Sequence, residues 1–164
     1  MAVGARTRAW LLALVAAAVV VLVDQLSKAA VRSSIALGET RSLLPGVQLV
    51  DTRNKGIAFG FLPGRHWAIT ALVALALLVL LVYFALHAAR PLIWLPTGML
   101  IGGALGNVLD RVRAGSVTDF VKLPLGWPPF NLADAAITLG ILLLALVVER
   151  REPQTPAVDR TERR

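Results

Sequence analysis

The sequence predicts an all-α integral membrane protein, with four transmembrane helices and a small β-containing loop region at one membrane face. Hydrophobic residues make up 57% of the 164 residues and charged residues only 16%, whereas soluble domains average about 45–50% and about 25%. The apolar residues gather in long stretches separated by short polar segments, and a membrane span needs about 20 such residues. The chain has no cysteine, which excludes disulfides, a cysteine nucleophile and thiolate metal sites.

The first predicted span covers residues 9–31. It is apolar from Ala9 to Val23, and its apolar character resumes at Ala29 after a short polar segment. Arg6 and Arg8 before a short apolar run also fit a cleavable signal peptide, and this alternative stays open. The resumption at Ala29 favours a span, and the two arginines favour a cytoplasmic N-terminus.

The remaining spans are predicted over residues 67–89, 91–110 and 129–148, so that residues 1–148 form one domain. Partial alternation of apolar and polar residues predicts short strands at 47–52 and 117–123. A turn and a further extended piece are expected over 54–60. The tail 149–164 is rich in Arg, Glu and Pro, and its composition predicts disorder.

Polar residues near the spans are predicted to meet at one membrane face, because consecutive helices alternate in direction. Asn107, Asp110 and Arg111 stand at i, i+3 and i+4, so they share one side of a helix. Asp24 and Lys28, and also Asn131 and Asp134, share sides likewise. Ionisable residues inside a membrane segment are costly and indicate function. The alternative is that these acids only pair with Lys28 and Arg111 to hold the bundle together. Gly98, Gly102 and Gly106 predict a close approach of a neighbouring helix.

Asp119 lies in an otherwise apolar stretch from Val117 to Val121, and Asp134 has no cation at helical spacing in the sequence. Two such acids at one face suggest a carboxylate pair. Close carboxylates share a proton and titrate together. One of them is then able to act as a general base toward water and the other as a general acid.

Other chemistries have weaker support. His66 and His87 are predicted at opposite faces, so they share no metal site, and we expect no metal and no cofactor. Lys28 with Ser33 or Ser116 would make a Ser–Lys dyad, although no spacing demands one. The net charge of +7 fits juxtamembrane arginines near anionic lipid, and we expect no nucleic-acid partner. Both faces carry similar numbers of cations, so the totals do not decide orientation.

The sequence resembles the lipoprotein signal peptidases, the signal peptidase II family. The resemblance rests on four segments, which occur in the family's order: DQLSK (24–28), NKGIAFG (54–60), GGALGNVLDRVRAGSVTDF (102–120) and FNLADAAI (130–137). The resemblance covers the chain from about residue 10 to 148, excluding the tails. Four ordered segments are a specific signal, whereas a single one would be weak.

The resemblance implies an intramembrane aspartic endopeptidase of the bacterial cytoplasmic (inner) membrane. Such an enzyme removes the signal peptide from diacylglyceryl-modified prolipoproteins, before the lipidated cysteine. Asp119 and Asp134 match the catalytic dyad. Matches to substrate-binding or supporting positions are Asn54, Gly56, Asn107, Asp110, Arg111, Asn131, Asp24 and Lys28.

The same resemblance implies that the site and its loop region are extracytoplasmic and that both termini are cytoplasmic. The expected partners are lipid-modified prolipoproteins and membrane lipids, and a monomer suffices. Two alternatives remain: a proton or ion transporter that uses the same acids, and a non-catalytic scaffold. Transporter sites usually lie near the bilayer midplane between related halves. Here the acids lie toward one edge, and no similarity between halves is visible.

Overall fold

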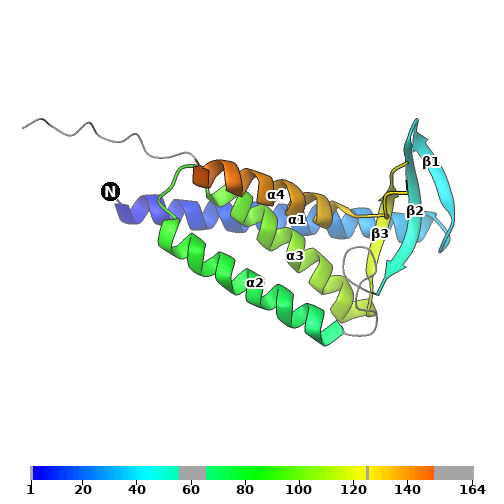
Figure 1. The fold of residues 1–164 in the computed structure, drawn as a ribbon, viewed down its shortest axis with the longest axis horizontal. Coiled ribbons are helices and arrows are strands. Elements are labelled where there is room, and N and C mark those ends of the chain that lie inside the picture. Colours follow the sequence, from blue (N-terminus) through cyan, green and yellow to red (C-terminus); the bar gives the residue numbers. More distant parts are fainter. Residues whose placement is uncertain (1, 56–65, 125, 150–164) are drawn as a thin grey trace, which may run out of the picture.

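The computed structural model describes residues 2–55, 66–124 and 126–149. Its elements are α1 (Ala2–Ser34), β1 (Thr40–Leu44), β2 (Val47–Asn54), α2 (His66–His87), α3 (Trp94–Ala114), β3 (Val117–Lys122) and α4 (Leu132–Glu149). The helices lie along one another and the sheet closes one end of the bundle (Figure 1). Gly56 and the tail beyond Glu149 were singled out in the sequence and lie outside the described residues.

Two of the described helices, Gly4–Ser34 and Leu132–Glu149, are long and apolar enough to cross a membrane. A shorter apolar helix runs over Ala71–His87. The count of four spans stays a prediction. Leucines on three helices are exposed, with Leu14 at 59%, Leu78 at 58% and Leu142 at 57%. An apolar surface of this extent fits contact with lipid better than contact with water.

The helix that contains Asp24 does continue, as predicted, and it extends past the predicted span at both ends. The third helix begins at Trp94, three residues later than the predicted span. The chain turns before it, with Leu92 in the left-handed region at φ 62°. The turn reverses the chain between α2 and α3, so the apolar run there is not all helix.

Glycines allow α3 to lie between α1 and α4. A Cβ atom added at Gly98 would lie 2.6 Å from Ala16 Cβ, and one at Gly102 would lie 2.7 Å from the carbonyl oxygen of Ala17 on α1. At Gly103 a Cβ would lie 2.6 Å from the carbonyl oxygen of Ala133 on α4. The predicted close approach of a neighbouring helix is therefore confirmed, and it occurs on two sides of α3.

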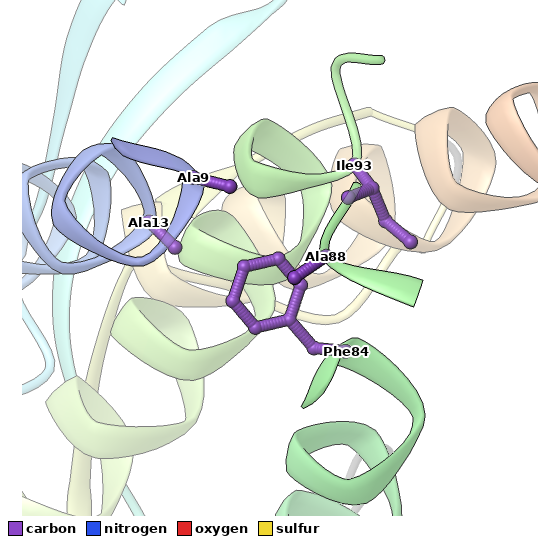
Figure 2. Close-up of a cluster of buried hydrophobic side chains, with 5 residues drawn as sticks. All are labelled: Ala9, Ala13, Phe84, Ala88 and Ile93. Atoms are coloured by element: carbon purple, nitrogen blue, oxygen red, sulfur yellow. The ribbon is translucent and has the colours of Figure 1, made fainter. Parts of the chain in front are cut away.

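A small apolar core closes the bundle at the end away from the sheet. It consists of Ala9, Ala13, Phe84, Ala88 and Ile93, drawn in Figure 2. The rings of Trp10 and Phe84 meet edge to face, with centroids 4.6 Å apart. These contacts attach the C-terminal end of α2 to α1, and they leave the opposite end of the bundle for polar groups.

The sheet has the order β1-β2-β3, and both pairs of strands are antiparallel. The predicted strands at 47–52 and 117–123 are confirmed as β2 and β3. The strand β1 was not predicted, although Pro45 and Gly46 mark the turn between it and β2, with Gly46 at φ 81°. The register pairs Thr52 with Asp119. Most of the predicted extended piece at 54–60 lies outside the described residues.

Candidate active site

Asn131 joins the two predicted catalytic residues. It stands just before α4, next to a bridge between Val121 and Phe130 that brings this segment beside β3. Its side-chain amide donates to Asp119 Oδ1 at 2.6 Å, and its Oδ1 accepts from the backbone N–H of Asp134 at 2.9 Å. The backbone N–H of Asn131 donates in turn to Asp134 Oδ2 at 3.3 Å. This reciprocal pair is a helix N-cap, and it satisfies backbone donors at the start of α4.

Two further side-chain amides donate to the carboxyl oxygens of Asp119 and Asp134 that Asn131 does not contact. Asn54 Nδ2 at the end of β2 donates to Asp119 Oδ2 at 3.0 Å, and Asn107 Nδ2 on α3 donates to Asp134 Oδ1 at 2.8 Å. The hydroxyl of Thr52 donates to the backbone carbonyl of Asp119 at 2.9 Å. Each carboxyl group is thus fixed from two sides, and both line one cavity of about 1090 Å³.

Burial changes the acidity of Asp119, which is only 3% exposed. Loss of hydration raises the pKa of Asp119 from its usual 3.8 to about 6, and the charge of Asp134 contributes to the rise. The hydrogen bonds from Asn54 and Asn131 oppose this shift of the pKa. A carboxyl group with this pKa is able to hold or release a proton near neutral pH.

Lys28 is fully buried behind this pair and uses all three of its donors. Its Nζ lies 2.8 Å from Asp24 Oδ2, 3.1 Å from Asp110 Oδ2 and 3.0 Å from Asn107 Oδ1. The ammonium group is therefore paired with two carboxylates. It also orients Asn107, which reaches Asp134.

The Ser–Lys dyad left open by the sequence finds no support in these contacts. Ser33 Oγ donates to the carbonyl of Ala30 at 2.9 Å, and Ser116 Oγ donates to the carbonyl of Ala114 at 3.5 Å. The three polar contacts of Lys28 go to other residues. Neither serine is therefore placed to be activated by Lys28.

Asp24 and Asp110 hold other elements in place. Asp24 Oδ1 accepts from the backbone N–H of Ala133 on α4 at 3.0 Å, and Asp110 Oδ2 accepts from that of Thr118 on β3 at 3.1 Å. They thereby fasten the two segments that carry the catalytic candidates. These contacts fit the alternative that Asp24 and Asp110 hold the bundle together. Asp110 pairs with Lys28 on α1, at 3.1 Å.

Gln25 belongs to the same network, and the sequence did not single it out. Its Nε2 lies within 3.1–3.2 Å of Asp24 Oδ2, Asp110 Oδ1 and the carbonyl oxygen of Gly106. Its Oε1 accepts from Arg113 at 3.3 Å. No spacing rule indicates an amide that bridges two helices, so this residue is found only from the tertiary structure.

The cavity extends from the aspartates along α2, α3 and α4. Arg111 lines it and donates to the carbonyl of Asn107 at 3.2 Å. Its apolar lining comes from several elements and includes Val73, Ala104, Trp127, Phe130, Ile137 and Leu139. A largely apolar cavity that contains a carboxyl pair suits a substrate with a long apolar part and one bond to hydrolyse. Within the described part of the chain, no group of three His, Cys, Asp or Glu residues is placed to hold a metal ion.

A family model described as "Signal peptidase (SPase) II" matches residues 16–149. The chain belongs to the signal peptidase II family. The resemblance inferred from four sequence segments is therefore confirmed, and with it a function as a lipoprotein signal peptidase. The matched residues include both aspartates and every residue of the network behind them.

Relatives agree with this assignment to signal peptidase II. The lipoprotein signal peptidase of Syntrophomonas wolfei is 44% identical over 130 residues, 79% of this chain and 87% of the relative. That of Halothermothrix orenii is 36% identical over 135 residues, 82% and 92% of the two chains. A bacterial membrane enzyme solved by the in meso method superposes with a TM-score of 0.78 at 28% identity, over 83% of this chain and 86% of that one. A second such structure gives a TM-score of 0.72, also at 28% identity, over 85% and 94%.

Proposed function

We propose that this signal peptidase II is an aspartic endopeptidase of the bacterial inner membrane. It removes the signal peptide from diacylglyceryl-modified prolipoproteins by cleaving before the lipidated cysteine. The observation that carries the proposal is the joint contact of Asn131 with Asp119 and Asp134, which both line the apolar cavity. Membership of the family supports the substrate class.

The chemistry follows from a carboxyl pair that shares one proton. The ionised member takes a proton from a water molecule, which attacks the scissile carbonyl carbon. The protonated member donates its proton to the carbonyl oxygen, which gives a tetrahedral diol. When the C–N bond breaks, the first member passes the proton it took from water to the leaving amine, and the second recovers a proton from the diol. The raised pKa of Asp119 supports such a division of roles near neutral pH. Asn54 and Asn107 keep both carboxyl groups facing the cavity.

The proposed topology has four spans, both termini in the cytoplasm and the sheet on the extracytoplasmic side. The cleavage point of a lipidated signal peptide lies near that surface, where acyl chains and water are both within reach. The apolar groove beside the aspartates is open to the acyl chains and the apolar part of the peptide. A single copy of the chain carries both aspartates, so a monomer suffices.

A cleavage assay with a synthetic diacylglyceryl-modified prolipoprotein, with enzyme in liposomes, tests this proposal. Asp119→Asn and Asp134→Asn are each expected to lower turnover by about 10³-fold or more. Asp51→Asn is the matched control, because Asp51 is an equally buried aspartate of the sheet that does not line the cavity. Near-normal turnover of either dyad variant would refute the mechanism. Ion flux in liposomes without peptide would instead indicate a transporter.

A further inference from the structure

Two arginine side chains converge on one buried hydroxyl group behind the catalytic strand. Arg32 in the last turn of α1 donates to Thr118 Oγ1 at 3.2 Å, and Arg53 on β2 donates to the same atom at 2.6 Å. Thr118 is only 1% exposed, whereas the side chain of Arg53 is 30% exposed and Arg32 is exposed. The two guanidinium groups therefore meet at the surface over a buried polar base.

The arginines carry more positive charge than their surroundings balance. Their two donating nitrogens lie within about 6 Å of each other, where like charges repel. Asp51 Oδ2 lies 2.9 Å from Arg53 Nη2 and is almost fully buried beneath it. Among the described residues Arg32 forms no ion pair, so one positive charge remains in excess. A bound anion would remove the repulsion between the two arginines.

The position of this cluster separates it from the catalytic pair. Thr118 and Asp119 are consecutive on β3, so their side chains point to opposite faces of the sheet. Asp119 and Arg53 line the cavity, whereas Thr118 and Arg32 do not. The cluster is therefore centred on Thr118, on the reverse side of the strand that carries Asp119, and Arg53 belongs both to it and to the cavity lining.

The depth of the cluster matches that of lipid headgroups. Leu26 on α1 is 60% exposed, and Arg32 follows it by roughly 9 Å along the helix axis. The C-terminal end of α1 reaches the sheet (Figure 1). In the proposed topology this end of α1 faces the extracytoplasmic side. Lys and Arg are usually enriched on the cytoplasmic side of membrane proteins, so an excess of cations here is unusual. A ligand for them is therefore expected at this level.

We propose that Arg32, Arg53 and Thr118 form a binding site for a phosphate group, carried by an anionic phospholipid such as phosphatidylglycerol. Guanidinium groups present planar, paired donors that match phosphate oxygens, and the hydroxyl supplies a further hydrogen bond. The excess positive charge favours a lipid with net negative charge over a zwitterionic one. The inference rests on the proposed membrane topology and not on the peptidase mechanism.

The test measures binding of phosphatidylglycerol to the full chain in an uncharged detergent, by native mass spectrometry over a lipid titration. Arg32→Gln and Arg53→Gln are each expected to weaken binding about fivefold, and the double variant about thirtyfold. Arg41→Gln is the control, since Arg41 lies on β1 in an exposed pair with Glu39. Thr118→Val removes the hydroxyl, keeps both cations and is expected to weaken binding a few-fold.

Two further arms identify the ligand. Phosphatidylcholine is expected to bind more weakly than phosphatidylglycerol to the wild type and equally to the double variant. Displacement of the lipid by millimolar inorganic phosphate would support the site with free phosphate as its ligand, and no displacement would support the lipid. Equal binding of phosphatidylglycerol to the wild type and the double variant would overturn the proposal. The assay contains no peptide, so a failure of the peptidase mechanism would leave its result unchanged.

Discussion

The side-chain amide of Asn131 donates a hydrogen bond of 2.6 Å to Asp119. The same side chain caps α4 through the backbone N–H of Asp134. The start of a helix and the position of a carboxyl group on a distant strand are therefore set by one residue. Because a cap fixes the direction in which a helix begins, the spacing of the two aspartates follows from the local structure of one asparagine.

Asn131→Ala is predicted to lower kcat/KM by about 10–100-fold, because positioning of Asp119 and the cap are both lost. The hydrogen bond from Asn131 lowers the pKa of Asp119, so its removal raises that pKa further. The limb of the pH–rate profile that reports Asp119 should therefore move to higher pH. Asn131→Ser keeps a capping oxygen but lacks the amide donor, and it should show the same shift with a smaller loss of stability. A profile unchanged in both variants would argue against this role.

The sequence alone predicted that the polar residues lie together, but it did not predict the contacts among them. Helix periodicity and alternating helix direction correctly placed Asp24, Lys28, Asn107 and Asp134 at one end of the bundle. The contact of Lys28 with Asp110 depends on how α1 and α3 are rotated against each other, and close packing at glycines sets this rotation. Sequence spacing describes one helix at a time, so it indicated neither this contact nor the role of Gln25.

The sheet shows the same limit. Partial alternation of apolar and polar residues predicted β2 and β3, which both contain buried residues. It did not predict β1, in which all five residues are exposed. A strand without a buried face does not need to alternate apolar and polar residues, so its sequence lacks the signal that predicts a strand. The convergence of Arg32 and Arg53 on Thr118 was equally hidden, since it joins a helix end to two strands.

Lys28→Met is predicted to destabilise the protein by about 3–5 kcal/mol, because it leaves Asp24 and Asp110 buried without a cation. Thermal unfolding in detergent measures the effect. Adding Asp24→Asn to Lys28→Met should recover part of the loss, because one buried charge is then removed and the amide oxygen introduced by this substitution still accepts from the backbone N–H of Ala133. Strict additivity of the two changes would contradict the pairing.

Gly102→Ala is predicted to destabilise the bundle by about 1–3 kcal/mol, since its Cβ would lie 2.7 Å from the carbonyl oxygen of Ala17. Backbone atoms of α1 must move to accept it. Gly4→Ala is the control, because no atom lies within 4 Å of a Cβ at that position on α1. The control should unfold at the wild-type temperature or slightly above it, because alanine favours a helix over glycine. Equal unfolding temperatures for the two variants would contradict the close packing of α1 and α3.

Asp119 should make the stability of the protein fall as the pH rises from about 4 to about 6. Its pKa is about 6 in the folded protein and 3.8 in ordinary surroundings, so the folded state binds the proton more tightly and loses this advantage through that window. The contribution is at most about 3 kcal/mol. Asp119→Asn removes this contribution, and the unfolding temperature of the variant relative to wild type should therefore increase between pH 4 and pH 7.

Glu39→Gln is the control for this prediction. Arg41 lowers the pKa of Glu39, so any trend in the unfolding temperature of this variant relative to wild type is small and opposite in sign. A constant difference between Asp119→Asn and wild type would show that Asp119 is not titrating in this window.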